Sequence, residues 1–363
     1  MKKLLWVVLA VFTALALVAC QPKDEGSKDD AQTTDGDQEP AATNTSHELA
    51  GKKVALIMQS NLGTFSTQYI AGVTEQVEAF GGSVTVFTSE GDLAKMASNV
   101  DAAINQKFDA ILIDHGTGEA LNDGVTRAKE AGIAVVVFDA SVEVEGVPIL
   151  EQGDQTMATM TLEKLAKDFN GEANIVRIWV AGFAPMERRM AAYTEFLEAN
   201  SGIKEIATFG SVTANTALDT QSQMEAILKQ YPNEGDIHAI WAPFDEFAKG
   251  AVRALEQAGR TDIKVYGIDM SDEDLQMMQN DNSPWVASAA VDPTDIGRIQ
   301  VRYAYQILAG ETVDKNIVLN PVFVDRDSLP KEQITTEQLS EHIEGWGASD
   351  QGYTDDLRKL EGQ

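Results

Sequence analysis

The stretch KVALIMQSNLGTFSTQYIAGVTEQVEAFGGSVTV, residues 53–86, predicts a strand, a turn, a helix and a second strand in close succession. Residues 54–58 form a continuous apolar run, which is typical of a strand buried on both faces. Apolar residues then recur every three or four positions over 70–80, as on one face of a helix, and two glycines end it. The polar turn at 59–66 must therefore lie at the carboxyl end of the first strand, where open parallel sheets bind ligands.

This turn carries the first indication of a ligand. It places one aromatic ring, Phe65, among small polar side chains. A sugar has the matching chemistry, because its ring offers an apolar face to stack and hydroxyl groups to pair. The alternative is a connecting loop that contains one buried phenylalanine.

Strand-like runs alternate with helical ones along the rest of the chain. Runs at 110–113 and 133–138 are followed, in a second series, by runs at 174–180, 239–241 and 263–268. The length of 363 residues suits two lobes better than one core. A strand–helix rhythm that occurs twice predicts an α/β fold with two parallel sheets, each with helices on both faces.

Three of the predicted strands end in an acidic residue, namely Asp114, Asp139 and Asp269. Carboxylates at the carboxyl ends of parallel strands face the ligand crevice and accept hydrogen bonds from hydroxyl groups. Arg189, at the start of a predicted helix, can donate its planar guanidinium to the same ligand. The alternatives are helix caps for the acids and a surface ion pair with Glu187 for the arginine.

Residues 1–19 are predicted to be a signal peptide rather than part of the fold. A basic start precedes an apolar run that is shorter than the roughly 20 residues of a membrane-spanning helix. The run ends in Leu-Val-Ala-Cys, which resembles the lipobox of bacterial lipoproteins and predicts lipidation of Cys20. The alternative is a permanent N-terminal anchor. Residues 20–50 are acidic, low in complexity and without Phe, Trp or Tyr, so they predict a flexible tether.

The composition argues against several classes of function. A net charge of −29 argues against binding to nucleic acid or to anionic lipid. Cys20 is the only cysteine and the four histidines form no spaced pair, so neither an internal disulfide nor a metal site is expected. Dinucleotide, phosphate-loop and nucleophile-elbow motifs are missing from the sequence, so we expect no enzyme and no cofactor. A carboxylate pair for glycoside hydrolysis, Asp139 with Asp269, is the catalytic alternative.

Seven motifs stand out along residues 53–325. They are ALIMQSNLGTFSTQYIAG at 55–72, DAILID at 109–114, AGIAVVVFDA at 131–140, ERRMAAY at 187–193, APFDEFAKGAVRALEQAG at 242–259, KVYGIDMSDE at 264–273 and ASAAVDPTDIG at 287–297. In order, spacing and type they resemble the periplasmic sugar-binding proteins of the ribose and galactose type, which deliver ligands to ABC importers.

The resemblance implies the type I periplasmic-binding-protein fold, in which two Rossmann-like lobes are joined by a three-segment hinge. It divides the chain into a lipoprotein signal peptide at 1–19, an acidic tether at 20–50, an N-terminal lobe at 51–151 plus 292–320, a C-terminal lobe at 153–290 plus 322–330, and a C-terminal extension at 331–363. The hinge crossings are expected near Gln152, Val291 and Asn320–Pro321.

The family's ligand contacts fall on ten positions when they are carried over by motif. They are Gln59, Ser60, Phe65, Ser66, Asp114, Asp139, Arg189, Asn215, Phe244 and Asp269. Three polar family contacts are replaced, because Ala140, Phe244 and Val291 stand where members have Arg, Asn, and Gln or Asn. These departures favour a smaller, deoxygenated or partly apolar ligand over a fully hydroxylated hexose. Trp179 and Trp241 are either further apolar walls or core residues.

Two functions follow from the resemblance. The first is an extracytoplasmic, membrane-anchored lipoprotein, a monomer that captures a sugar, polyol or related ligand and delivers it to the permease of an ABC importer. The second is a sensor of the same fold that presents its ligand to a membrane chemoreceptor or sensor kinase. Because Asp114, Asp139 and Asp269 face only Arg189 among the basic residues placed in the crevice, a cationic ligand stays open beside a neutral one.

Overall fold

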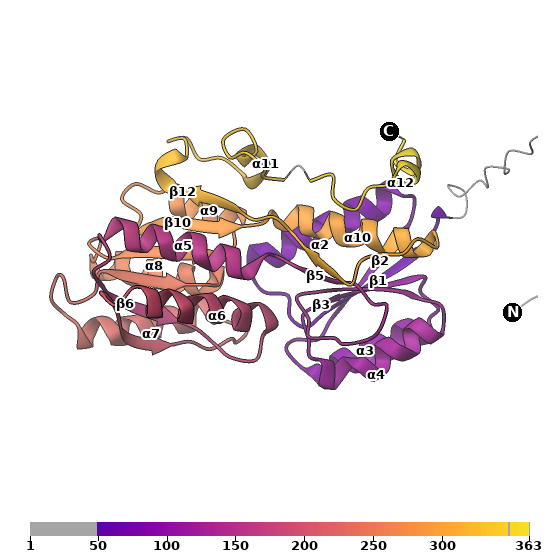
Figure 1. The fold of residues 1–363 in the computed structure, drawn as a ribbon, viewed down its shortest axis with the longest axis horizontal. Helices are drawn as coiled ribbons and strands as arrows, with labels where there is room; N and C mark the ends of the chain where they lie inside the picture. Colours follow the sequence, from indigo (N-terminus) through magenta and orange to yellow (C-terminus); the bar gives the residue numbers. More distant parts are fainter. Residues whose placement is uncertain (1–48, 348, 363) are drawn as a thin grey trace, which may run out of the picture. The chain divides into compact units, whose positions relative to one another are not determined.

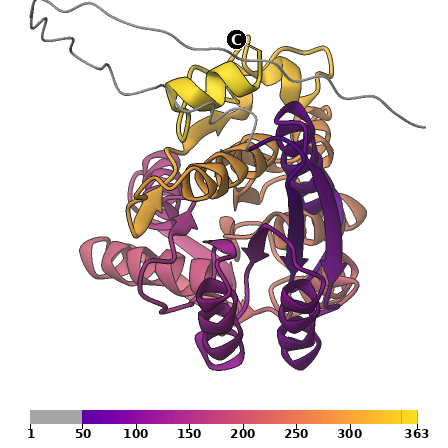
Figure 2. The same ribbon diagram turned by 90° about the vertical axis from the view of Figure 1, so that its right-hand side faces the viewer.

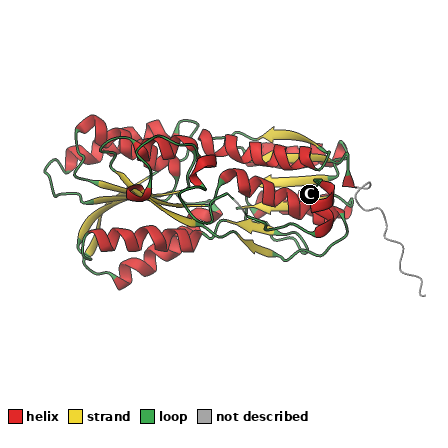
Figure 3. Cartoon of the chain, turned by 90° about the horizontal axis from the view of Figure 1, so that it is seen from above, coloured by secondary structure: helices red, strands yellow, loops and turns green. Residues whose placement is uncertain are grey.

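The computed structural model describes residues 49–347 and 349–362, so the predicted signal peptide, Cys20 and nearly all of the predicted tether lie outside the described residues. The described chain contains two six-stranded sheets, each with helices on both faces (Figures 1 and 3). This arrangement confirms the predicted α/β fold with two lobes. In this part of the chain no helix is both long enough and apolar enough to cross a membrane.

The first sheet has the order β11-β5-β4-β3-β1-β2, and all of its neighbouring strands are parallel. Its strands are β1 (Lys53–Met58), β2 (Ser83–Thr88), β3 (Ala110–Asp114), β4 (Ala134–Phe138), β5 (Ile149–Glu151) and β11 (Asn316–Val318). Its helices are α2 (Gly63–Ala79), α3 (Leu93–Asn105), α4 (Gly118–Glu130) and α10 (Pro293–Leu308). The apolar strands β1, β3 and β4 are buried between α2 and α10 on one face and α3 and α4 on the other.

The second sheet has the order β12-β10-β9-β8-β6-β7. Its strands are β6 (Ala173–Ile178), β7 (Ile203–Phe209), β8 (Ala239–Ala242), β9 (Lys264–Ile268), β10 (Trp285–Ala290) and β12 (Val322–Asp325). Its helices are α5 (Asp154–Asp168), α6 (Ala184–Ala199), α7 (Thr216–Gln230), α8 (Asp245–Ala258) and α9 (Asp272–Gln279). Strand β12 is antiparallel to β10, which differs from the parallel sheet that we predicted. Between β10 and β12 the chain runs through α10 and β11 of the first lobe. It therefore returns to the second sheet at the end where β10 leaves it, and β12 runs in the opposite direction.

The chain passes between the two sheets from β5 to α5, from β10 to α10, and from β11 to β12. Gln152 stands on the first of these passages and is buried. The next residue, Gly153, has a φ of +72°, and a Cβ there would lie 2.9 Å from the carbonyl oxygen of Leu319. Glycine is therefore required for its backbone angle and because the first and third passages touch at this point.

Beyond β12, residues 331–347 and 349–362 form a segment that we call the C-terminal strap. It follows η1 (Arg326–Ser328) and contains α11 (Thr336–Leu339) and α12 (Asp355–Leu360). Trp346 packs into the core of the second lobe, whereas Leu357 packs into the core of the first. Figures 1 and 2 show the strap in yellow, with α12 beside α10.

Arg302 of α10 attaches the second half of the strap to the first lobe. It donates hydrogen bonds to the carbonyl oxygens of Ser349 (2.8 Å) and Gln351 (3.2 Å). Its guanidinium also lies over the ring of Tyr353, 3.8 Å from the ring centroid. The segment predicted as a C-terminal extension therefore contacts both lobes.

Candidate functional site

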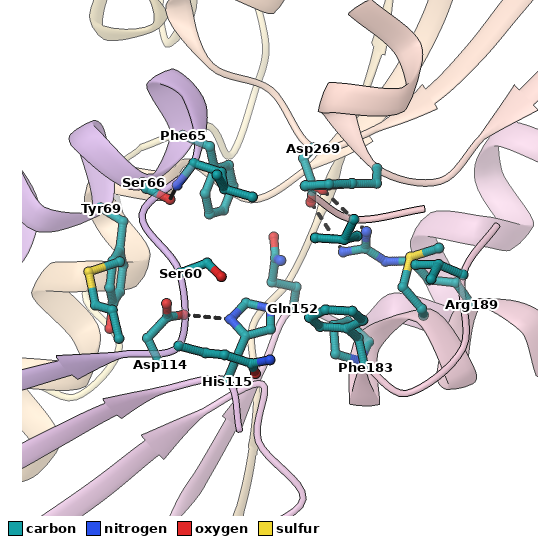
Figure 4. Close-up of a pocket in the computed structure, with 18 residues that line it drawn as sticks. Ser60, Phe65, Ser66, Tyr69, Asp114, His115, Gln152, Phe183, Arg189 and Asp269 are labelled. Atoms are coloured by element: carbon teal, nitrogen blue, oxygen red, sulfur yellow. Dashed lines mark hydrogen bonds and ion pairs between the residues drawn. The ribbon is translucent and has the colours of Figure 1, made fainter. Parts of the chain in front are cut away.

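A cavity of about 100 Å³ lies between the lobes, at the carboxyl ends of strands from both sheets (Figure 4). Its side chains come from the ends of β1, β3, β6 and β9 and from the starts of α2, α6 and α8. Ligands bind at this edge of open parallel sheets. Eight of the ten predicted contact residues line it, namely Gln59, Ser60, Phe65, Ser66, Asp114, Arg189, Phe244 and Asp269. Their contact with a ligand stays a prediction.

The first-lobe wall carries most of the polar side chains of the cavity. We define it as Gln59, Ser60, Ser66, Asp114 and His115, and beside them lie Met58, Leu62 and the rings of Phe65 and Tyr69. Gln59 Oε1 accepts a hydrogen bond from the backbone N–H of Gly116 (2.8 Å), which leaves its amide N–H groups for a ligand. Ser66 Oγ accepts from the backbone N–H of Leu62 (3.2 Å), which leaves its O–H to donate. The wall therefore offers hydrogen-bonding groups to hydroxyls.

Asp114 and His115 form a pair within this wall. Asp114 ends β3, and His115 follows it with a φ of +62°, so that its Nδ1 lies 2.7 Å from Asp114 Oδ1. Burial by itself lowers the pKa of His115, but the Asp114 carboxylate outweighs burial and raises the pKa to about 9. The imidazole is therefore protonated at neutral pH, and its Nε2–H is a second donor. Its ring meets Phe183 of the second lobe edge-on, with centroids 6.3 Å apart.

The second-lobe wall is apolar. We define it as Val180, Phe183, Pro185, Met186, Val212 and Phe244. Phe183 directly precedes α6, and Pro185 stands in the first turn of that helix, where no backbone donor is needed. Phe244 holds the same place before α8 and packs edge-on against Phe247, with centroids 5.2 Å apart. This wall offers side-chain surface to an apolar group and no side-chain hydrogen bond.

Trp179 and Trp241 do not belong to either wall. Trp241 is fully buried, where it stacks on Tyr193 with centroids 4.8 Å apart and donates to Thr161 Oγ1 (3.1 Å). Trp179 donates to the carbonyl oxygen of Met186 (3.2 Å) and packs against the second-lobe core. Trp241 is therefore a core residue, whereas Trp179 is half-buried against the core, and neither lines the cavity.

Arg189 and Asp269 lie side by side at the edge of the apolar wall (Figure 4). The Arg189 guanidinium is 2 % exposed and donates to Asp269 twice, at 3.1 and 3.2 Å. It also donates to Asp154 Oδ1 (2.7 Å) and to the carbonyl oxygen of Pro243 (2.7 Å). These contacts fix the guanidinium as a planar fork, and they leave one of its five N–H donors for a ligand.

The other two predicted contacts, Asp139 and Asn215, do not line the cavity. Asp139 is 1 % exposed, and it accepts hydrogen bonds from Arg188 of the second lobe and from Gln152 Nε2 (3.3 Å). The neighbouring arginine, rather than a ligand, thus occupies this carboxylate. Asn215 is exposed before the first turn of α7, and its side chain makes no capping hydrogen bond.

Each strand-end acid has a cationic partner. Asp114 is paired with His115, Asp139 with Arg188, and Asp269 with Arg189, although both arginines also share Asp154. The expectation that Arg189 is the only basic group in the crevice was therefore wrong. Three paired carboxylates attract a cationic ligand less than three free ones would.

Other cavity residues lacked a clear signal in the sequence. Tyr69 follows Phe65 by one helical turn and shares its face, which could have indicated it. His115 directly follows a predicted strand-end acid, Asp114, and this position is the signal that could have indicated it. The second-lobe wall, apart from Phe244, consists of apolar residue types that are indistinguishable in sequence from core residues. Among residues 49–347 and 349–362, no cluster of His, Cys, Asp and Glu could hold a metal ion.

Comparison with known proteins gives the fold a family. The family model described as "periplasmic binding protein domain" matches residues 54–312. A sugar ABC transporter structure from Yersinia enterocolitica is 36% identical with a TM-score of 0.84, covering 88% of this chain and 97% of that one. A 5-methylthioribose transporter solute-binding protein from Thermotoga lettingae, solved with 5-methylthioribose, is 36% identical with a TM-score of 0.83, covering 87% and 98%.

A curated relative agrees with these structures. The ribose import binding protein RbsB of Bacillus subtilis is 28% identical over 254 residues, which are 68% of this chain and 78% of that protein. These relatives are described as binding proteins of transporters rather than as enzymes, in agreement with the expectation that this chain is not an enzyme. Two lobes with a cavity at their facing strand ends, and a family model that spans most of both, make this chain a member of the periplasmic binding protein family.

Proposed function

We propose that this chain captures a pentose-like sugar with an apolar substituent between its lobes and delivers it to an ABC importer. The observation that carries the proposal is the unequal chemistry of the two cavity walls. A hydroxylated ring matches the first-lobe wall, and an apolar substituent matches the second-lobe wall. The Thermotoga relative, which is 36% identical, was solved with 5-methylthioribose, a sugar that has both parts.

A fully hydroxylated sugar fits this cavity less well. Any hydroxyl that reaches Val180, Phe183 or Phe244 leaves water without gaining a side-chain partner. Burying a hydroxyl without a hydrogen bond costs about 1–3 kcal/mol by protein mutational data, whereas each buried CH₂ gains about 0.8 kcal/mol. A methylthio group therefore favours binding where a hydroxyl opposes it. A neutral ligand also agrees with the pairing of all three strand-end acids.

Binding panels test the ligand class. Isothermal titration calorimetry of the wild-type protein should show tighter binding of 5-methylthioribose than of D-ribose. Phe183→Ala and Phe244→Ala should reduce that preference about tenfold or more, because a methylene-sized group in an apolar pocket is worth about 1–3 kcal/mol. Phe169→Ala is the matched control, since Phe169 lies in the same lobe beside His238 and away from the cavity. Equal or tighter binding of D-ribose by the wild-type protein would exclude a substituted sugar as the ligand.

The proposal includes the predicted anchor, with a monomer held outside the cytoplasmic membrane by lipidated Cys20. Support comes from the Leu-Val-Ala-Cys sequence that ends the apolar run. Cys20→Ser should move the protein from the membrane fraction to the soluble fraction and leave ligand affinity unchanged. A Cys20→Ser protein that stays in the membrane with its N-terminus intact would indicate a permanent anchor instead.

A further inference from the structure

We infer that Gln152, on the first passage between the lobes, accepts a hydrogen bond from a ligand hydroxyl and links that hydroxyl to the ion pair between the lobes. The inference rests on the proposed function, because it assumes a hydroxylated ligand in the cavity. Gln152 lines the cavity although it lies on neither wall. In Figure 4 its side chain stands between the first-lobe and second-lobe residues.

The side-chain oxygen of Gln152 is the unusual feature. The residue is 3 % exposed, and Oε1 has no hydrogen-bond partner within the described part of the chain. Buried polar side-chain atoms normally have one, and an unpaired buried carbonyl is costly. A hydroxyl that donates to Oε1 removes this cost. An apolar or deoxygenated atom in the same place leaves it, so the site discriminates between the two.

Asp139 fixes which way the Gln152 amide points. Its Oδ2 lies 3.3 Å from Gln152 Nε2, and its Oδ1 accepts from Arg188 Nη2. Burial raises the pKa of Asp139 to about 7, while the Arg188 guanidinium favours its ionised form, and Gln152 turns its NH₂ group toward the ionised carboxylate. The amide therefore cannot turn over without placing its oxygen against a carboxylate. Asp139 therefore determines the orientation of the amide, and this orientation leaves Oε1 as the acceptor without a partner.

The same contacts reach the other lobe. Arg188 stands in α6 of the second lobe and donates to Asp139, which follows β4 of the first. It also donates to Asp154 Oδ2 (2.7 Å) and pairs with Glu151 (3.1 Å), on either side of Gln152. A ligand hydroxyl bound by Gln152 would thus help to hold in place the Arg188–Asp139 ion pair that joins the lobes. The resemblance placed a ligand contact on Asp139. In this assignment Gln152, which donates to Asp139, contacts the ligand in its place.

Gln152→Met tests this assignment, because methionine keeps the length and loses the amide. The matched control is Gln155→Met, three residues along and exposed. Calorimetry with 5-methylthioribose, D-ribose, 2-deoxy-D-ribose and 3-deoxy-D-ribose should show about tenfold weaker binding of the hydroxylated probes in Gln152→Met. At least one deoxy probe should bind the wild type and the variant equally, since it lacks the hydroxyl that Gln152 accepts. Gln155→Met should match the wild type throughout.

Three outcomes would overturn the assignment. Unchanged affinity for every probe means that Oε1 meets no ligand. An equal loss for all probes, deoxy sugars included, means that Gln152 only supports the hinge. Binding of no probe by the wild-type protein overturns the proposed function, and this assignment with it. If thermal unfolding shows that Gln152→Met is not folded, Gln152→Asn replaces it, because asparagine keeps the amide and withdraws the oxygen; the same pattern across the probes is expected.

Discussion

In the first lobe, the turn between β1 and α2 lines the cavity with Gln59 and Ser60, whereas in the second lobe the turn between β6 and α6 lines it with Val180 and Phe183. Both turns follow a buried strand and precede a helix, so they hold the same place in their lobes. One nevertheless offers hydrogen bonds and the other apolar surface. The difference shows that this strand–turn–helix unit decides where a side chain stands, while the sequence decides what it recognises.

The two walls also differ in what lies behind them. The polar wall is supported by single hydrogen bonds between the turns after its strands, such as that from the backbone of Gly116 to Gln59. Beside the apolar wall lies the buried group of Arg189, Asp154 and Asp269, which joins α6, α5 and the end of β9. Because these charged side chains hold one another in place by hydrogen bonds, they keep the edge of the apolar wall rigid. Substitutions should therefore have larger effects on the second-lobe side.

Arg189→Ala should have the largest effect on stability and binding, so it is the strongest test of the difference between the two walls. It leaves the Asp269 carboxylate buried without its partner and leaves Asp154 with Arg188 alone, and breaking a buried ion pair in this way costs about 3–5 kcal/mol of folding free energy. Urea denaturation should show that loss, and calorimetry should show weaker binding of every sugar. Arg253→Ala is the control, because its side chain is 40% exposed in a surface pair with Glu273, which is worth about 0–1 kcal/mol. Equal losses in the two variants would contradict the structural role of Arg189.

A smaller effect is expected from Asp114→Asn in the polar wall. In the wild type, the pKa of His115 is raised to about 9, above the 6.5 of an unfolded histidine. The group's contribution to stability is therefore fully present below pH 6.5 and is lost as the pH rises through about 9. Without the carboxylate, burial lowers the pKa of His115, and the variant should lack this loss of stability between pH 6.5 and 9.

Urea denaturation at a series of pH values measures this difference, and NMR titration of the His115 ring measures the pKa directly. His342→Gln serves as the control, since His342 is exposed in the C-terminal strap. A His115 ring that titrates at the same pH in the wild type and in Asp114→Asn would show that the pair does not form in solution.

The smallest effect is expected from Asn215→Ala. Asn215 is exposed, outside both walls, and its side chain caps nothing. Affinity for 5-methylthioribose should change less than twofold, and the melting temperature should stay that of the wild type. A clear loss of affinity in calorimetry would instead extend the second-lobe wall to the start of α7 and make it partly polar.

The sequence was a good guide to the strands and to the polar wall. Continuous apolar runs locate β1, β3 and β4, and polar residues that follow such strands must stand at the ligand edge. Asp139 illustrates the limit. Arg188 and Arg189 are neighbours in sequence, and only the folded helix shows that one turns to Asp139 and the other to Asp269. The residues of the apolar wall, apart from Phe244, were not predicted as ligand contacts, because they are the same types that fill a core.

The C-terminal strap bears on the order in which the protein folds during synthesis. Leu49 and Leu357 lie in the same core, so the first lobe contains residues from both ends of the described chain. Its helix α2 also packs on α10, which the ribosome makes only after the strands β6 to β10 of the second lobe. Domains fold as their residues emerge, and a core of distant segments forms late. The lobe that is begun first is therefore completed last, and the face of α2 that packs on α10 has no partner until α10 has been made.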